Sequence, residues 1–320
     1  MKLEDYLHDD SQPWSASANG FRAVPAADFM ALAFPPRNAL VAPWLLKRSL
    51  NMVFAARGVG KTQFAMGLAY ALASGQPFLG WEVPQAAKVL YLDGEMAGAD
   101  MQTRWQLMGD MAQVGDNLYL ANPDLQMGFI PDLATEAGRQ DIEDLLASEQ
   151  PHLLIIDNKS VFMRATKENE GDSWAPIQSW LLGLKSDGYS VLLVHHAGKN
   201  GMQRGSSRIE DCMDVILQLK YPADYVRGED MGATFEIHFE KARHLYGANT
   251  KPLHVTLQPN ATGTGCWTVK PAENPYQEAI QLLKEGISQK EITEILEVPK
   301  GTVSKWKQKA ISEGLLETDT

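Results

Sequence analysis

The chain has 320 residues, of which 44% are hydrophobic and 22% charged, with 26 glycines, 17 prolines and 2 cysteines. This composition excludes a disordered, collagen-like or disulfide-stapled chain, and the length allows one large α/β domain with a small accessory module. The formal net charge of -11 excludes indiscriminate nucleic-acid binding over the whole surface. Cys212 and Cys266 form neither a metal-binding nor a redox motif, which favours a reducing cytoplasm.

The N-terminus is acidic and lacks the apolar run of a signal peptide, and residues 1–37 mix acidic residues with Ser, Ala and Pro. We expect a tail or linker over 1–37. The strongest apolar runs, at 89–92, 153–156 and 191–194, are far shorter than the ~20 residues that span a bilayer. We therefore expect a cytoplasmic protein with no membrane partner.

Short β-like runs alternate with helical patterns in the middle of the chain. The expected strands are 51–54, 88–92, 118–121, 153–156 and 190–195, and the expected helices are 61–74, 99–112, 135–148 and 173–186. This alternation predicts an α/β fold with a mainly parallel sheet and helices on both faces. The later runs 215–219, 234–239, 253–257 and 267–269 are expected to extend the sheet in antiparallel fashion. We place the α/β domain at 38–270 and a small all-α module at 271–320.

The segment 54–62 reads FAARGVGKT and lies between a predicted strand and a predicted helix. It follows the phosphate-binding pattern G-x-x-x-x-G-K-[ST], except that Ala55 stands at the first glycine. In this pattern backbone amides wrap a triphosphate, the lysine reaches the β- and γ-phosphates, and the hydroxyl binds Mg²⁺. A strongly positive φ would strain Ala55, so the start of the loop is the weakest part of the match. The expected ATP-binding residues are Ala55, Ala56, Arg57, Gly58, Val59, Gly60, Lys61, Thr62 and Gln63.

Two predicted strands end in carboxylates, and ligands bind at the carboxyl ends of strands in doubly wound sheets. The run LLIID ends in Asp157, which we expect to hold Mg²⁺ together with Thr62. The run VLYLDGE ends in Glu95, which we expect to be the general base, with Asp93 in a supporting position. The alternative is that Asp93 and Glu95 are ordinary loop charges.

Three further groups suit phosphate chemistry. The strand before residue 197 ends in two histidines that face opposite sides, so they do not form one metal site, and we expect His195 to sense the γ-phosphate. The glycine-rich segment 197–207 carries Lys199 and Arg204 and suits the phosphates of a nucleotide or of DNA. Lys241 and Arg243 lie two apart on one face of a strand. Either they neutralise charge at a phosphoryl-transfer site, in cis or from a neighbouring subunit, or they are ordinary exposed cations.

Together these motifs resemble the RecA-like ATPase family, particularly plasmid hexameric replicative helicases of the RepA type and their phage and mobile-element relatives. The resemblance covers about 38–258 and depends on the segments 55–62, 91–96, 154–157 and 195–207. It implies that Glu95 is catalytic and that Arg204 acts across a subunit interface. Lys241 and Arg243 resemble the trans-acting pair of bacterial replicative helicases, so Arg204 and Arg243 compete for one role. It further implies a ring of six subunits, while Ala55 departs from the family's usual glycine.

The C-terminal module reads as helix, turn, helix, with Ser288 capping the middle helix and Glu291 as its capping-box partner. It resembles the helix-turn-helix family. Val303 and Trp306 are expected to pack inward. The expected contacts to duplex DNA are Lys300, Thr302, Ser304, Lys305 and Lys309. The alternative is a three-helix bundle that binds protein.

These features predict a Mg-ATP-hydrolysing DNA motor with single-stranded DNA in a channel, contacted by Lys199 and Arg204. The catalytic residues would be Lys61, Glu95, His195, Arg204, Lys241 and Arg243. One alternative is an ATP-controlled switch, such as a recombination mediator, helicase loader or replication regulator, that does not unwind DNA. Another is a DNA-binding regulator whose ATPase fold is inactive.

Overall fold

The structure is a computed structural model that describes residues 15–16, 22–34, 36–127, 129–164, 174–197, 208–222, 225, 232–261, 263–272, 275–296, 298–299 and 301–316. Its strands are β1 (Ser15–Ala16), β2 (Arg22–Ala23), β3 (Ala39–Val41), β4 (Leu45–Leu46), β5 (Leu50–Ala55), β6 (Val89–Asp93), β7 (Leu118–Ala121), β8 (Leu153–Asp157), β9 (Ser190–His196), β10 (Val215–Lys220), β11 (Ala233–Ala242), β12 (Leu253–Pro259) and β13 (Gly265–Pro271). Its α-helices are α2 (Ala26–Ala31), α3 (Lys61–Ser74), α4 (Gly98–Met108), α5 (Glu136–Glu149), α6 (Lys159–Phe162), α7 (Ala175–Ser186), α8 (Arg208–Asp211), α9 (Pro275–Lys284), α10 (Gln289–Ile295) and α11 (Thr302–Ser312).

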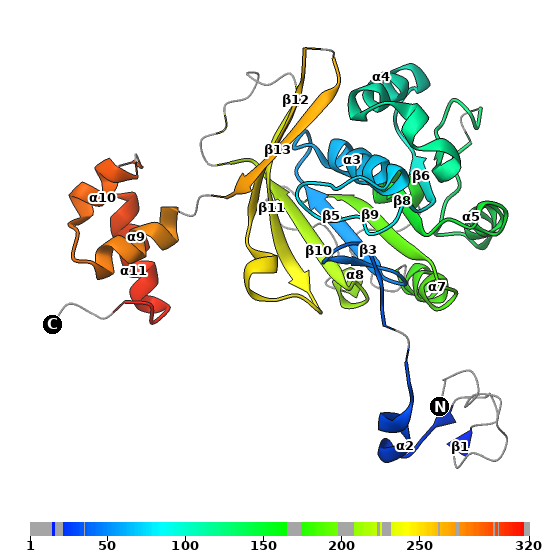
Figure 1. The fold of residues 1–320 in the computed structure, drawn as a ribbon, viewed down its shortest axis with the longest axis horizontal. Coiled ribbons are helices and arrows are strands. Elements are labelled where there is room, and N and C mark those ends of the chain that lie inside the picture. The colour runs from blue at the N-terminus through cyan, green and yellow to red at the C-terminus, as the bar shows by residue number, and fades with distance from the viewer. Residues whose placement is uncertain are drawn as a thin grey trace.

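A nine-stranded sheet of order β13-β12-β11-β10-β5-β9-β8-β6-β7 forms the centre of the molecule (Figure 1). The strands from β10 to β7 in this order are all parallel, because each pair is joined by a crossover rather than by a hairpin. β11, β12 and β13 then continue the sheet in antiparallel fashion. The α/β fold with a mainly parallel sheet is thus confirmed. The antiparallel direction expected for 215–219 is wrong, because β10 pairs in parallel with β5.

Two hydrophobic layers cover the two faces of the sheet, because alternate residues of each strand point to opposite sides. In β5, Val53 packs in the layer formed with α3 and α4, whereas Met52 packs in the layer formed with α5 and α7. The central strands are buried on both faces, as expected for parallel strands covered by helices. This construction leaves the carboxyl ends of β5, β8 and β6 together at one edge of the sheet.

The chain ends differ from this core. Within 1–37, which we expected to be a tail or linker, the structure describes the β1–β2 pair and α2. No residue of α2 is buried. At the other end, α9, α10 and α11 form a hydrophobic core of their own around Ala279, Ile292 and Val303 (Figure 1). Among the described residues, no helix has both the length and the apolar character needed to cross a membrane.

Candidate nucleotide site

The phosphate loop spans 56–60, between the end of β5 and the start of α3. Gly58 (φ +84°) and Gly60 (φ +116°) are in the left-handed region, where a side chain would strain the backbone. A Cβ on Gly60 would also lie 3.0 Å from the ring of Phe235. Ala55 is the last residue of β5 and is therefore extended, so the strain expected at the start of the loop is absent. The loop requires glycine where the sequence has it and tolerates alanine at 55.

The side chain of Lys61 folds back over this loop. Its Nζ donates hydrogen bonds to the carbonyl oxygens of Ala55 (3.1 Å) and Ala56 (2.9 Å). Burial lowers the pKa of Lys61 to about 8, and the nearby carboxylates of Asp157 and Glu95 act in the opposite direction. Phosphate oxygens bound in the loop are better partners for this ammonium than two neutral carbonyls, because charge-assisted hydrogen bonds are stronger.

Asp157 ends β8 and is buried beside the first turn of α3. Its Oδ2 accepts a 2.7 Å hydrogen bond from Tyr91 Oη, and its carboxylate also accepts one from the Thr62 hydroxyl. Burial raises the pKa of Asp157 to about 6; the hydrogen bonds from Tyr91 and Thr62 and the charge of Lys61 act against this rise, whereas Asp93 adds to it.

The donor set at Asp157 and Thr62 fits Mg²⁺, which binds carboxylate and hydroxyl oxygens. Mg²⁺ usually takes one or two carboxylates and completes its shell with phosphate and water, rather than using a full protein cage. The part of the chain that the structure describes contains no cluster of three or more His, Cys, Asp or Glu side chains placed to hold a metal.

Asp93 and Glu95 lie at the end of β6, which pairs with β8 so that Asp93 is level with Asp157. The Oδ1 of Asp93 accepts hydrogen bonds from the backbone N–H groups of Glu95 (2.9 Å) and Met96 (2.6 Å), so this carboxylate fixes the turn that carries Glu95. The side chain of Glu95 is exposed, and it is near enough to Lys61 to act on the pKa of that group. The geometry therefore gives the two carboxylates different tasks: Asp93 holds the backbone and Glu95 faces solvent.

The two histidines of β9 lie on opposite faces, as expected. His195 is only 1% exposed and pairs with Phe54, which packs in the layer of α5 and α7, away from α3. His196 is level with Ala55, and its Nε2 lies 3.2 Å from Nδ2 of Asn158. The prediction that His195 meets a phosphate is at odds with this burial. His196 is on the opposite face from His195 and was not among the residues expected at the site; alternation along the strand is the pattern that separates the two.

Lys241 and Arg243 lie at the far end of the parallel strands from the phosphate loop. Lys241 on β11 is opposite Ile216 on β10, and Ile216 is opposite Met52 on β5. Met52 lies three residues before Ala55, the last residue of β5. At ~3.3 Å per residue, Lys241 is therefore level with a point ~10 Å before the end of β5. Both cations donate to backbone carbonyls at the end of α8, Lys241 to Glu210 and Arg243 to Asp211. The backbone of this pair is therefore set apart from the phosphate loop of its own chain, and an action across a subunit interface is compatible with the structure.

Three predicted contact residues, Lys199, Arg204 and Lys300, lie outside the described residues. On α11, Ser304 and Lys305 are exposed and Thr302 is half-buried. The ammonium of Lys309 lies 4.8 Å from the ring centroid of Tyr276 and 3.7 Å from Glu313. Lys309 is therefore engaged within the module, whereas Lys305 has no such contact among those that the structure gives.

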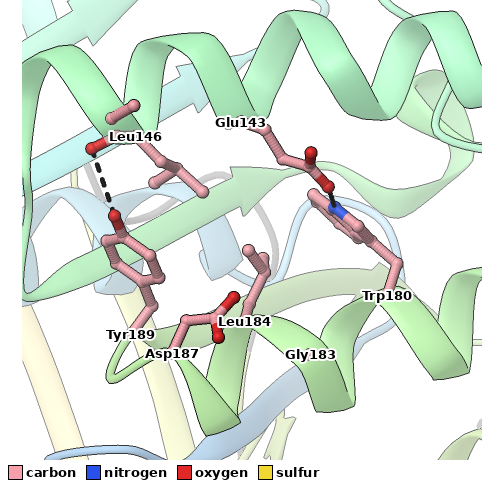
Figure 2. Close-up of a pocket in the computed structure, with 8 residues that line it drawn as sticks. Glu143, Leu146, Trp180, Gly183, Leu184, Asp187 and Tyr189 are labelled. Atoms are coloured by element: carbon pink, nitrogen blue, oxygen red, sulfur yellow. Dashed lines mark hydrogen bonds between the residues drawn. The ribbon is translucent and has the colours of Figure 1, made fainter.

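A pocket of about 460 Å³ lies between α5 and α7 (Figure 2). Trp180 Nε1 donates a 2.8 Å hydrogen bond to Glu143 across it, and Tyr189 Oη donates to the carbonyl of Leu146 at 3.3 Å. Tyr189 directly precedes β9, so the pocket is at the amino-terminal edge of the sheet. Ligands of doubly wound sheets bind at the opposite edge, so this pocket is separate from the phosphate site.

The fold and the phosphate loop define the class of the protein: it is a P-loop ATPase with a RecA-like core. A family model described as an AAA domain matches residues 15–202, which is more than half of the chain, and the chain belongs to this family. Among solved structures, KaiC-like protein PH0186 from the hyperthermophilic archaeon Pyrococcus horikoshii OT3 has a TM-score of 0.52 at 12% identity, over 74% of this chain and 99% of that one. This similarity supports the fold. The comparison with curated proteins gives no match.

Proposed function

We propose that this ATPase is a ring-forming DNA motor of the replicative-helicase type, encoded by a plasmid, phage or other mobile element and acting in the cytoplasm. The observation that carries the proposal is the separation between the phosphate loop and the cation pair Lys241 and Arg243. Cations set apart from the phosphate loop of their own chain suit a head-to-tail ring, because a heterologous interface brings opposite edges of two copies together.

ATP hydrolysis follows from the residues at the carboxyl edge of the sheet. Glu95 orients a water molecule for in-line attack on the γ-phosphorus, and Lys61 offsets the charge on the transferring group. Thr62 and Asp157 would hold Mg²⁺, which supplies further charge neutralisation when it is bound. Arg243 or Arg204 of an adjacent subunit completes the site.

DNA contacts are assigned to two regions. We assign Lys199 and Arg204 to contacts with single-stranded DNA in the channel of a ring of six, where cations follow the DNA backbone. The C-terminal module binds duplex DNA through α11, with Thr302, Ser304 and Lys305 at the start of the helix, Lys300 just before it and Lys309 one turn further on.

Strand displacement on a forked DNA substrate tests this proposal. The intact chain should separate the strands with Mg-ATP and should fail without nucleotide. Glu95→Gln should bind ATP and DNA but release no strand. A chain that hydrolyses ATP but never displaces a strand, at several fork geometries and protein concentrations, contradicts the motor.

One alternative is favoured by a specific observation, the separate hydrophobic core of the C-terminal module. A self-contained DNA-binding unit suits an ATP-controlled switch, such as a recombination mediator, helicase loader or replication regulator, in which nucleotide controls assembly on DNA. For a switch, ATP binding alone changes DNA affinity, so Glu95→Gln retains the full response to ATP. For a motor, the change in DNA affinity requires ATP hydrolysis.

A further inference from the structure

Two stacked tyrosines lie beside the phosphate loop, and neither is among the residues of the P-loop pattern. Tyr221 directly follows β10, and the ring of Tyr225 stacks on it with a centroid distance of 4.3 Å and an interplanar angle of 12°. The backbone N–H of Tyr225 donates to the carbonyl of Pro222 (3.1 Å). A Cβ on Gly58 would lie 3.3 Å from Tyr221 Oη, so the pair reaches the loop itself.

The strand order gives the direction in which a bound nucleotide runs. β5, which carries the phosphate loop, has β10 on one side and β9, β8 and β6 on the other. Asp157 ends β8 and Glu95 lies two residues after β6, so the γ-phosphate must point to that side for hydrolysis. Adjacent strands are ~4.8 Å apart, so the remainder of the nucleotide extends over the end of β10. Tyr221 and Tyr225 lie at that end.

We propose that Tyr221 and Tyr225 form the platform on which the base of the nucleotide stacks. The proposal rests on the nucleotide site of the proposed function and adds the residues that hold the purine base of ATP, whose two fused rings cover more of an aromatic surface than one ring does. Tyr221 packs against the core of the α3 face, which holds the platform in place. Gly58 is left-handed (φ +84°), and a Cβ there would also press on the tyrosine hydroxyl.

Two ligands distinguish binding of the base from binding of the phosphates. Mg-ATP carries both groups, whereas inorganic tripolyphosphate with Mg²⁺ carries the phosphates alone. Calorimetric titration of the full chain with both should show that Tyr225→Ala and Tyr225→Leu weaken Mg-ATP binding by ~10-fold, because stacking on a flat ring is lost. Tripolyphosphate affinity should stay at the wild-type value, which also shows that the variants are folded.

Tyr246→Ala is the matched control, because Tyr246 is 86% exposed and lies beyond β11, away from the loop. It should leave both affinities unchanged. Unaltered Mg-ATP affinity in both Tyr225 variants overturns the platform, and so does an equal loss for the two ligands. A wild-type chain that binds neither ligand contradicts the proposed function instead, so the two failures are distinct.

Discussion

The carboxyl group of Asp157 is buried between the hydroxyl groups of Tyr91 and Thr62. Because burial raises its pKa to about 6, the folded chain binds a proton there more tightly than the unfolded chain does. Stability therefore falls as pH rises from the unfolded value of 3.8 through about 6, and the deficit persists above that range. At neutral pH the ionised group destabilises the empty protein.

Asp157→Asn should relieve this cost, because the amide is neutral and its oxygen still accepts the hydrogen bond of Tyr91. We predict that the free energy of unfolding at pH 7.5 rises by about 1–3 kcal/mol. The gain should shrink at pH 5, where the native carboxyl group is itself mostly protonated, and ATP hydrolysis should be lost. Urea denaturation at the two pH values measures the difference. A variant less stable than the parent at pH 7.5 is the contrary result.

The affinity for Mg-ATP should depend on pH through two groups. Lys61 is protonated below a pKa of about 8, and Asp157 is ionised above a pKa of about 6. Binding needs the ammonium and the carboxylate together, so calorimetry should find the tightest Mg-ATP binding between pH 6 and 8 and weaker binding at pH 5 and 9. Lys61→Arg keeps its charge at pH 9 and should show no loss between pH 7 and 9. An alkaline loss of equal size in Lys61→Arg would remove Lys61 as its cause.

At the scale of elements, the capping box of α10 tests the C-terminal module on its own. Ser288 Oγ accepts from the N–H of Glu291 (3.3 Å), and Glu291 Oε2 accepts from the N–H of Ser288 (3.1 Å). Ser288→Ala should destabilise the module by ~1 kcal/mol, seen as faster hydrogen exchange of the α10 amides. Exchange in β5 and β8 should not change. Ser304→Ala, an exposed serine within α11, is the control, and equal effects of the two substitutions would argue against the cap.

Element order could be predicted from the sequence because periodicity distinguishes buried strands from amphipathic helices. The expected helix 61–74 has the same bounds as α3, and the expected strand 118–121 has those of β7. Strand direction is a different matter: 215–219 reads as a strand in either direction, and only the crossover from β9 makes β10 parallel. The short elements β3, β4, α6 and α8 carry too few residues to show a period.

The site was predictable in part, for a related reason. Lys61 and Thr62 follow the loop after β5, Asp157 ends β8 and Glu95 lies two residues after β6, so the parallel strands bring all four to one edge of the sheet. The platform of Tyr221 and Tyr225 was not predictable, because its relation to Gly58 depends on which strand lies next to β5. The same applies to Lys241 and Arg243, whose distance from the phosphate loop follows from the antiparallel turn of β11.

At the scale of the whole molecule, the position of Arg243 predicts that activity is shared between subunits. Glu95→Gln and Arg243→Ala should each lack ATPase activity as pure proteins. A 1:1 mixture that assembles at random should recover about a quarter of the parental rate, because an interface between an intact glutamate and an intact arginine forms again. Lys270→Ala, on β13, is a control that should stay active. A mixture as inactive as its components would contradict the shared site.

The central claim is that the loop 56–60 and Lys61 bind a triphosphate. Its most direct test is a calorimetric titration of the folded chain with Mg-ATP, alongside Lys61→Ala. We predict saturable one-to-one binding to the parent and a loss of roughly 100-fold or more in the variant, since a charge-assisted contact to phosphate is removed. The absence of any heat with the parent, or unchanged affinity in Lys61→Ala, would contradict the account.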